Sequence, residues 1–247
     1  AYIDGIPHVR RPFGGRRASV AAGSSARAAR EVREKARRIA AHQLEASVDD
    51  IEFDDGKFHV TGAPDRSMHI QGIAREAYLG HDLPEGMDPG LEVTDFYDPE
   101  NFTFPFGTHV AVVEVDQDTG DIDIRRYVAV DDCGEIINPL IVDGQVHGGI
   151  AQGIGAALFE GASYDEEGHL ETRRMDEYAV PHSTQLPDFE TDNTVTPSPH
   201  NPLGVKGVGE SATIAATPTI VAAVSDALQP FDIDHLDIPI TPETVWR

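Results

Sequence analysis

The stretch VDGQVHGGIAQGIGAALFE, residues 142–160, predicts a helix that carries glycines at positions 148, 149, 153 and 155. Each glycine inside a helix costs up to about 1 kcal/mol relative to alanine. So many costly residues on one helix imply that a backbone or a ligand approaches it closely. We therefore expect this helix to lie against another segment or at a ligand site.

The segments around this helix predict a hairpin, a second helix and a tail. THVAVVEVDQDTGDIDIRRYVAVDDCG, residues 108–134, alternates apolar and polar residues on both sides of a turn at Gly120, which predicts a β-hairpin. SATIAATPTIVAAVSDAL, residues 211–228, predicts a helix with Pro218 near its first turn. HLDIPITPETVW, residues 235–246, is expected to be an extended tail.

The N-terminal part adds a helix and a hairpin of its own. Residues 24–47 carry an apolar stripe at helical spacing, with Ser24 or Ser25 as the expected cap. Residues 50–62 alternate around an Asp-Asp-Gly turn, and residues 79–107, rich in proline, glycine and acids, predict a long surface loop. Hairpins and helices interleave without a repeating βαβ order, so the sequence predicts an α+β fold with mixed or antiparallel sheets and packed helices.

The chain is strongly acidic, with 43 Asp and Glu against 19 Lys and Arg and a formal net charge of −24. Such a surface repels nucleic acid and anionic membranes, so neither is an expected partner. Two interpretations stay open: adaptation to high salt in a halophilic host, and an ordinary acidic enzyme. Residues 1–38 differ, because they hold ten basic and three acidic side chains, and this charge suits an anionic ligand or an acidic neighbouring chain.

An apolar content of 40% in 247 residues is enough for a buried core, in one large domain or two closely joined ones. No uninterrupted run approaches the roughly 18 apolar residues of a membrane helix, and the first residues show no signal-peptide pattern. Cys133 is the only cysteine, so the chain cannot form an internal disulfide or hold an iron–sulfur cluster by itself. We expect a cytoplasmic protein without membrane insertion.

Three weaker motifs do not predict a ligand site. DQDTGD, residues 116–121, resembles the start of a calcium loop, but Tyr127 stands where the bidentate glutamate is required. The eleven histidines show no paired spacing, so no metal held directly by side chains is expected. The Gly-x-Gly at Gly153 and Gly155 falls inside a helix pattern and lacks the context of a dinucleotide site.

NPLGVKGVGES, residues 201–211, places three glycines and one carboxylate, Glu210, directly before a helix. Glycines at a helix start expose successive N–H groups, which hold an anion or donate to a heterocycle. A glutamate there serves as a general base if burial raises its pKa toward the working pH. The alternative interpretation, a turn with a capping acid, stays open from the residues alone.

A family resemblance covers nearly the whole chain in order. Three blocks carry it: residues 130–160, VDDCGEIINPLIVDGQVHGGIAQGIGAALFE, then 176–189, DEYAVPHSTQLPDF, and 196–228, TPSPHNPLGVKGVGESATIAATPTIVAAVSDAL. They resemble the C-terminal part of the molybdopterin-binding large subunit of the xanthine dehydrogenase and aldehyde oxidoreductase family. The most similar branch is the aerobic carbon monoxide dehydrogenase large chains.

The resemblance implies a role for each matching residue. Glu210 matches the active-site glutamate that acts as a base beside the molybdenum, and Gly207, Val208 and Gly209 match the loop whose amides bond the pterin. It also implies cofactor contacts for three further side chains, Gln145, Lys206 and Gln152. Gln145 is expected near the pyranopterin and Lys206 at a phosphate or pterin oxygen, whereas a packing role for Gln152 weighs equally.

The N-terminal loop departs from the family pattern. Gly15 and Arg17 stand where the family typically has serines, while Arg16 remains. The hydroxyl contacts expected there with cofactor phosphates are thereby in doubt, although the extra arginine supplies charge. Arg16 is kept as a cofactor-binding candidate, with a solvated basic turn as its alternative.

The family's large subunits are much longer than this chain, and their N-terminal part carries further cofactor loops and the substrate determinants. We expect residues 1–247 to be one C-terminal molybdenum-cofactor-binding region, with subdomains 1–107 and 108–247, and to be either a natural split subunit or a fragment. The resemblance implies a molybdenum-containing oxidoreductase that is active only with a partner chain carrying the missing half. A non-catalytic scaffold is the alternative.

The resemblance also implies cofactors and partners. The expected cofactor is a molybdenum-pterin, in the molybdopterin cytosine dinucleotide form, held by its dithiolene rather than by side chains. Iron–sulfur clusters and FAD are expected on separate subunits, in a dimer of heteromers, and copper is expected in a carbon monoxide oxidiser. Carbon monoxide, an aldehyde and a heterocycle all stay open as substrates.

Overall fold

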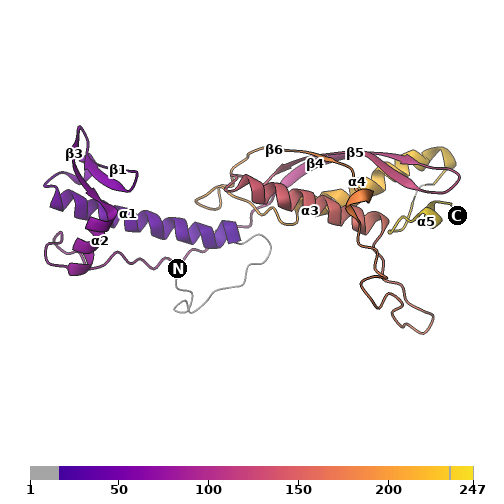
Figure 1. Cartoon of the computed structure of the whole chain (residues 1–247), viewed down its shortest axis with the longest axis horizontal. Helices are drawn as coiled ribbons and strands as arrows, with labels where there is room; N and C mark the ends of the chain where they lie inside the picture. Colours follow the sequence, from indigo (N-terminus) through magenta and orange to yellow (C-terminus); the bar gives the residue numbers. More distant parts are fainter. Residues whose placement is uncertain (1–16, 234, 247) are drawn as a thin grey trace. The chain divides into compact units, whose positions relative to one another are not determined.

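The computed structural model describes residues 17–233 and 235–246 of the chain. Two compact units are present: Val20–Asp98 form the smaller one, and the chain from Pro99 onward forms the larger one, to which Ser19 also belongs (Figure 1). Each unit has its own hydrophobic core.

The smaller unit packs two helices on a three-stranded antiparallel sheet. Its elements are α1 (Gly23–Gln43), β1 (Ile51–Asp54), β2 (Lys57–Val60), β3 (Ala63–His69) and α2 (Ile70–Leu79), with strand order β1-β2-β3. The predicted helix and hairpin are confirmed, and Asp55 and Gly56 form the turn with positive φ angles of 43° and 73°. The long loop is also confirmed, since no helix or strand lies between α2 and Phe106.

The predicted cap of the first helix is wrong. A π-helical turn, η1 (Arg17–Ala22), leads directly into α1, and Ala22 occupies the cap position without a side-chain bond. The two serines are therefore already inside helical backbone, and Ser24 donates to Asp95 O while Ser25 donates to Ala21 O.

The larger unit packs two long helices against one mixed sheet. Strands β4 (Phe106–Val115) and β5 (Ile122–Asp132) are antiparallel, and β6 (Phe189–Asn193) pairs parallel with β5, in the order β4-β5-β6. Helices α3 (Pro139–Leu158) and α4 (Ser211–Leu228) bury their apolar residues with Tyr127 of the sheet in one core. The α+β class with a mixed sheet and packed helices is confirmed.

Two glycines of α3 let α4 approach at backbone distance. A methyl group added at Gly153 would lie 2.5 Å from Cβ of Ala216, and one added at Gly149 would lie 2.9 Å from Cβ of Ala212. The hydroxyls of Thr213 and Thr217 donate across the contact to the carbonyls of these glycines, at 3.2 and 3.1 Å. The expected close approach of a backbone is thus confirmed here, and α4 provides it.

Two expectations near the C-terminus are wrong. Pro218 lies inside α4 rather than near its first turn, because the helix already begins at Ser211. Proline has no N–H group to donate to the carbonyl of Ile214, four residues earlier, but Ile214 is exposed. The tail ends in a short helix, α5 (Pro242–Trp246). Thr241 accepts a hydrogen bond from the Thr244 amide at 3.2 Å, so Thr-Pro-Glu was a helix start that the sequence interpretation missed.

One helix of the described chain is long and apolar enough to cross a membrane. It is α4 with the turn after it, Ser211–Phe231, and 28% of its apolar 18-residue window is buried in the structure. Length and composition alone are weak evidence, because a core helix of a globular protein passes the same test. Here one face of α4 packs in the core of the larger unit.

The two classes of glycine in α3 predict opposite effects on stability. Gly153→Ala should lower the free energy of unfolding by at least about 2 kcal/mol, because the new methyl overlaps Ala216. Gly148→Ala on the same helix should raise it by up to about 1 kcal/mol, because no atom lies within 4 Å of the added methyl. Urea unfolding followed by circular dichroism measures both, and equal effects would contradict the packing described above.

Candidate functional site

The glycine-rich loop, residues 201–210, is hydrogen-bonded to the end of β5 before the chain enters α4. Gly134 and Val205 form an isolated antiparallel bridge. The amide of Glu135 donates to Gly204 O at 3.1 Å, and the amide of Lys206 donates to Cys133 O at 2.7 Å. The loop therefore starts from a fixed backbone position at the end of the sheet.

Asn201 and two glycines shape this attachment. The buried Asn201 amide donates to Val205 O at 2.8 Å, and its oxygen accepts from the amides of Leu203 and Val205. Gly134 and Gly204 have positive φ angles of 70° and 68°, which residues with a Cβ adopt only with strain. A methyl group at Gly134 would also lie 2.3 Å from Gly204 O.

A buried ion pair lies directly under the loop. Nζ of Lys206 is 2.9 Å from Oδ1 of Asp132, and the two side chains are 8% and 0% exposed. Burial alone would raise the pKa of the Asp132 carboxyl, but hydrogen bonds from Lys206, the Gly134 amide and two threonine hydroxyls outweigh it and hold the pKa at about 2. Asp132 is therefore ionised, and it keeps the ammonium of Lys206 in place.

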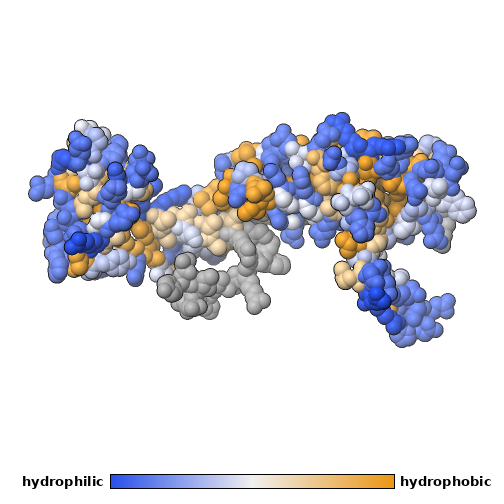
Figure 2. Space-filling view, in the orientation of Figure 1, coloured by the Kyte–Doolittle hydropathy of each residue, from blue (hydrophilic) through white to orange (hydrophobic). Residues whose placement is uncertain are grey.

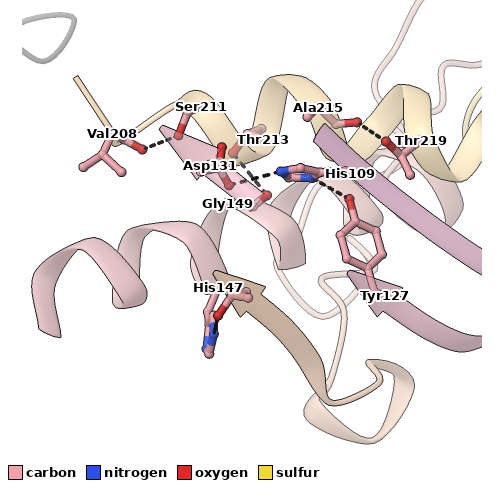
Figure 3. A network of polar contacts seen from close by, with 11 residues as sticks. His109, Tyr127, Asp131, His147, Gly149, Val208, Ser211, Thr213, Ala215 and Thr219 are labelled. Carbon is pink, nitrogen blue, oxygen red and sulfur yellow. Dashed lines mark hydrogen bonds and ion pairs between the residues drawn. The ribbon is translucent and has the colours of Figure 1, made fainter. Parts of the chain in front are cut away.

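Residues 207–210 come to the surface beyond this pair. Gly209 and Glu210 are exposed, and Glu210 is the residue just before α4, where its side chain makes no capping hydrogen bond. The hydroxyl of Ser211 closes the turn by donating to Val208 O at 3.1 Å (Figure 3). Glu210 therefore occupies the cap position of α4 without making a capping hydrogen bond, and its carboxylate is exposed at the surface of this chain.

The side chain of Gln145 on α3 lies next to Gly209 of the glycine-rich loop. A methyl group added at Gly209 would lie 3.3 Å from Oε1 of Gln145, so these residues are neighbours. Gly144 and Gly148, on either side of Gln145, have no atom within 4 Å of an added methyl. The structure therefore brings Gln145 together with Gly209 and Glu210 at a surface that has little side-chain bulk.

The two other predicted site residues that the structure describes, Gln152 and Lys206, are bonded to neighbouring side chains. Gln152 accepts a hydrogen bond from the Thr213 hydroxyl at 3.3 Å, which fits its packing alternative. Lys206 is engaged by Asp132, and its ammonium also lies 4.5 Å from the centre of the Phe106 ring. Arg16 lies outside the described residues. Cofactor contacts by these three residues stay predictions.

Sequence reasoning missed a second buried polar cluster, between β4, β5 and α4 (Figure 3). His109 Nε2 lies 3.1 Å from Asp131 Oδ2, and its Nδ1 lies 2.9 Å from the Tyr127 hydroxyl. Burial raises the pKa of that hydroxyl, a hydrogen bond with Thr219 opposes the shift, and the charge of Asp131 adds to it. The pattern that could have indicated this cluster is His109 itself, a polar residue at an inward-facing position of a strand with alternating apolar residues.

One surface group has the composition of a metal site. Ligand atoms of Asp165, Glu167 and His169 all lie within 4.8 Å of one another. Asp165 already accepts hydrogen bonds from the backbone amide of His169 at 2.7 Å and pairs with its ring at 3.0 Å. Exposed acidic groups of this kind are common without an ion, so the expectation that side chains hold no metal stays a prediction.

Comparison with protein families identifies this architecture. Residues 4–187 match the model of the molybdopterin cofactor-binding domain. The chain belongs to this family. The matched range includes Gln145 and ends before the glycine loop, which is covered by the longer matches to individual relatives.

Those relatives are large subunits of oxidoreductases. The chain is 43% identical over 235 residues to the carbon monoxide dehydrogenase large chain of Hydrogenophaga pseudoflava, covering 95% of this chain and 29% of that one. It is 41% identical over 236 residues to the nicotine 6-hydroxylase large subunit of Paenarthrobacter nicotinovorans, with coverages of 95% and 29%. The expected resemblance to carbon monoxide dehydrogenase large chains is confirmed.

Solved structures share the fold. A Cu,Mo carbon monoxide dehydrogenase in its carbon monoxide reduced state superposes with a TM-score of 0.90 at 38% identity, over 98% of this chain and 30% of that one. Quinoline 2-oxidoreductase from Pseudomonas putida 86 gives a TM-score of 0.89 at 42% identity, over 96% and 30%. The chain thus spans about 30% of the length of the proteins it matches.

The exposed residues of this molybdopterin cofactor-binding domain fit a large planar cofactor. Exposed glycine backbone at Gly209 and open space beside Gly144 and Gly148 leave room for a ring system to approach. The Gln145 amide provides both a donor and an acceptor at the same place. Main-chain amides just before a helix add donors suited to heterocycle or phosphate oxygens.

The attachment of the glycine loop predicts a difference between two glycines with similar backbone. Gly134→Ala and Gly168→Ala both place a Cβ at positive φ, at 70° and 83°, which costs about 1 kcal/mol each. Only the first clashes, with Gly204 O, so it should lower the free energy of unfolding by at least about 2 kcal/mol more than the second. Equal losses in urea unfolding would mean that the bridge does not hold the loop.

Proposed function

We propose that this chain supplies part of the active site of a molybdenum-containing oxidoreductase, with Glu210 as its general base. The observation that supports this most directly is the meeting of Gln145 and Gly209 beside the exposed Glu210. These residues combine cofactor-binding groups and one free carboxylate within a domain of the molybdopterin-binding family.

We assign a task to each candidate residue, including Arg16, which lies outside the described residues. The amides of residues 207–209 and the side chain of Gln145 would hold the pterin, and Arg16 would contribute charge toward its phosphates. When bound, the cofactor supplies the two-electron oxidation of the substrate. The protein holds the cofactor, orients the substrate and accepts the released proton.

Glu210 is suited to accept that proton because its carboxylate is not used elsewhere in the described structure. It makes no capping bond, and the helix that follows fixes its backbone. A catalytic base must reach the proton it removes and be ionised before the reaction. A partner chain that covers this exposed edge would exclude water from around the carboxylate during the reaction.

Two substrate classes are supported. Identity of 43% to a carbon monoxide dehydrogenase large chain supports carbon monoxide, with copper beside the molybdenum. Identity of 41% to a nicotine 6-hydroxylase large subunit supports hydroxylation of a nitrogen heterocycle. An aldehyde is a weaker third choice. The copper content of the purified enzyme separates the first class from the others.

The proposed enzyme needs further polypeptide. Because this chain spans about 30% of its relatives, we propose that the remaining part of the large subunit is supplied by a second chain or, if this sequence is a fragment, by the rest of the same chain. We further propose iron–sulfur and FAD subunits, a dimer of heteromers, molybdopterin cytosine dinucleotide as the cofactor form, and a cytoplasmic location at high salt. The net charge of −24 supports the high-salt setting.

The first experiment is metal and nucleotide analysis of the complex purified from its native host at high salt. We expect molybdenum, iron and a pterin nucleotide in a multi-chain complex, and little molybdenum in this chain alone. Copper in the complex would select carbon monoxide as the substrate. A metal-free single chain would instead support the scaffold alternative, and tight stoichiometric molybdenum in the isolated chain would contradict the need for a partner.

The active complex allows a direct test of Glu210. Glu210→Gln keeps the shape of the side chain and removes the base, so turnover should fall by at least about 100-fold while molybdenum content stays unchanged. Glu114→Gln is the matched control, because Glu114 is an exposed acid on β4 that pairs with Arg125. It should leave turnover unchanged. Normal turnover in the Glu210 variant would refute the proposed role.

A further inference from the structure

Lys206 is the one lysine of the glycine-rich loop, and its ammonium group is bound by other residues of the larger unit. Its ammonium lies 2.9 Å from Asp132 Oδ1 and 4.5 Å from the centre of the Phe106 ring. Because the side chain is 8% exposed, little of it is open to a ligand. A lysine that binds a phosphate group directly would need an exposed ammonium group, and that of Lys206 is buried against Asp132.

Asp132 is held as firmly as its partner. Oδ1 also accepts from the Gly134 amide at 2.9 Å, and Oδ2 accepts from the Thr194 hydroxyl at 3.0 Å. These donors come from the segment after β5 and the segment after β6, so the carboxylate joins both to the loop. A buried carboxylate with this many donors has one preferred position.

We propose that Lys206 and Asp132 are a positioning pair, which places residues 207–210 opposite Gln145, and that Lys206 does not contact the cofactor itself. The proposal rests on the proposed function for the role of the loop. It assigns Lys206 differently from the family resemblance, which predicted a phosphate or pterin contact.

The covalent structure explains how the pair acts on the site. Lys206 is bonded directly to Gly207, and its own amide is fixed on Cys133 O. Gly207 and Gly209 have no side chains to anchor the segment, and Val208 packs against the core. At the far end, Ser211 bonds Val208 O and begins α4. The course of residues 207–210 is therefore set by Lys206 before it together with Val208 and Ser211, and loss of the Lys206 anchor would free the start of the segment.

The first test measures amide exchange in this chain, with three variants. Lys206→Met leaves Asp132 buried without its counter-ion, which is far less favourable than removing both charges. Hydrogen exchange of two backbone amides, those of residue 206 and Glu135, should be at least about 10-fold faster in this variant. The double variant Lys206→Met with Asp132→Asn should return exchange to within about 3-fold of the original chain.

Arg126→Met is the control for loss of a salt bridge as such. Arg126 pairs with Glu190 at the surface, where the two side chains are 60% and 53% exposed. Exchange of the two reporter amides should be unchanged in this variant. Unchanged exchange in Lys206→Met as well would overturn the proposal, because the loop would then be held without the pair.

The second test measures molybdenum content in the assembled complex. A positioning pair predicts that Lys206→Met loses molybdenum and that the double variant recovers it. Direct contact with the cofactor predicts that the double variant stays as poor in molybdenum as the single one although its amide exchange is restored. That second result would overturn the proposal. A wild-type complex without molybdenum would refute the proposed function instead, and the exchange rates would then decide the role of the pair.

Discussion

The close contact between α3 and α4 is the constraint on which the larger unit depends. At Gly149 and Gly153 the helices approach so closely that added methyl groups would overlap α4, and threonine hydroxyls bond across to the glycine carbonyls. This contact fixes the rotation of both helices about their axes, because another face of α3 would present side chains instead of backbone.

The candidate site is a consequence of the same register. Gln145 lies one turn before Gly149 on α3, and Glu210 directly precedes α4, two positions before Ala212. Fixing Gly149 against Ala212 therefore fixes the two site residues relative to each other. The buried pair under the loop and the bridge at Gly134 supply the remaining restraints, from the end of β5.

Sequence reasoning predicted the elements with strong periodicity and missed those decided by tertiary contact. The glycine-rich helix and the hairpins were predictable because their patterns repeat over many residues. The serine caps were not, since the sequence did not reveal that helical backbone precedes them. Pro218 was misplaced because a proline suggests a helix start, whereas α4 accepts it at an exposed turn.

The site shows the same division. Glu210 and Gln145 became candidates through a family resemblance, but no pattern in the sequence indicated that Lys206 would be bound to an aspartate 74 positions earlier. Burial of that pair is a property of the folded chain, set by where β5 ends. Likewise, the role of Asn201 follows from three backbone contacts that only the loop geometry creates.

Asp131 and Asp132 are neighbours in β5, yet they serve different clusters: Asp131 pairs with His109 and Asp132 pairs with Lys206. Successive residues of a strand point to opposite faces, so a shift of one position would exchange the two carboxylates. A single-residue insertion or deletion within β5 would therefore disrupt both clusters at once. During evolution, length changes in this domain should be confined to its loops, while β5 changes only by substitution.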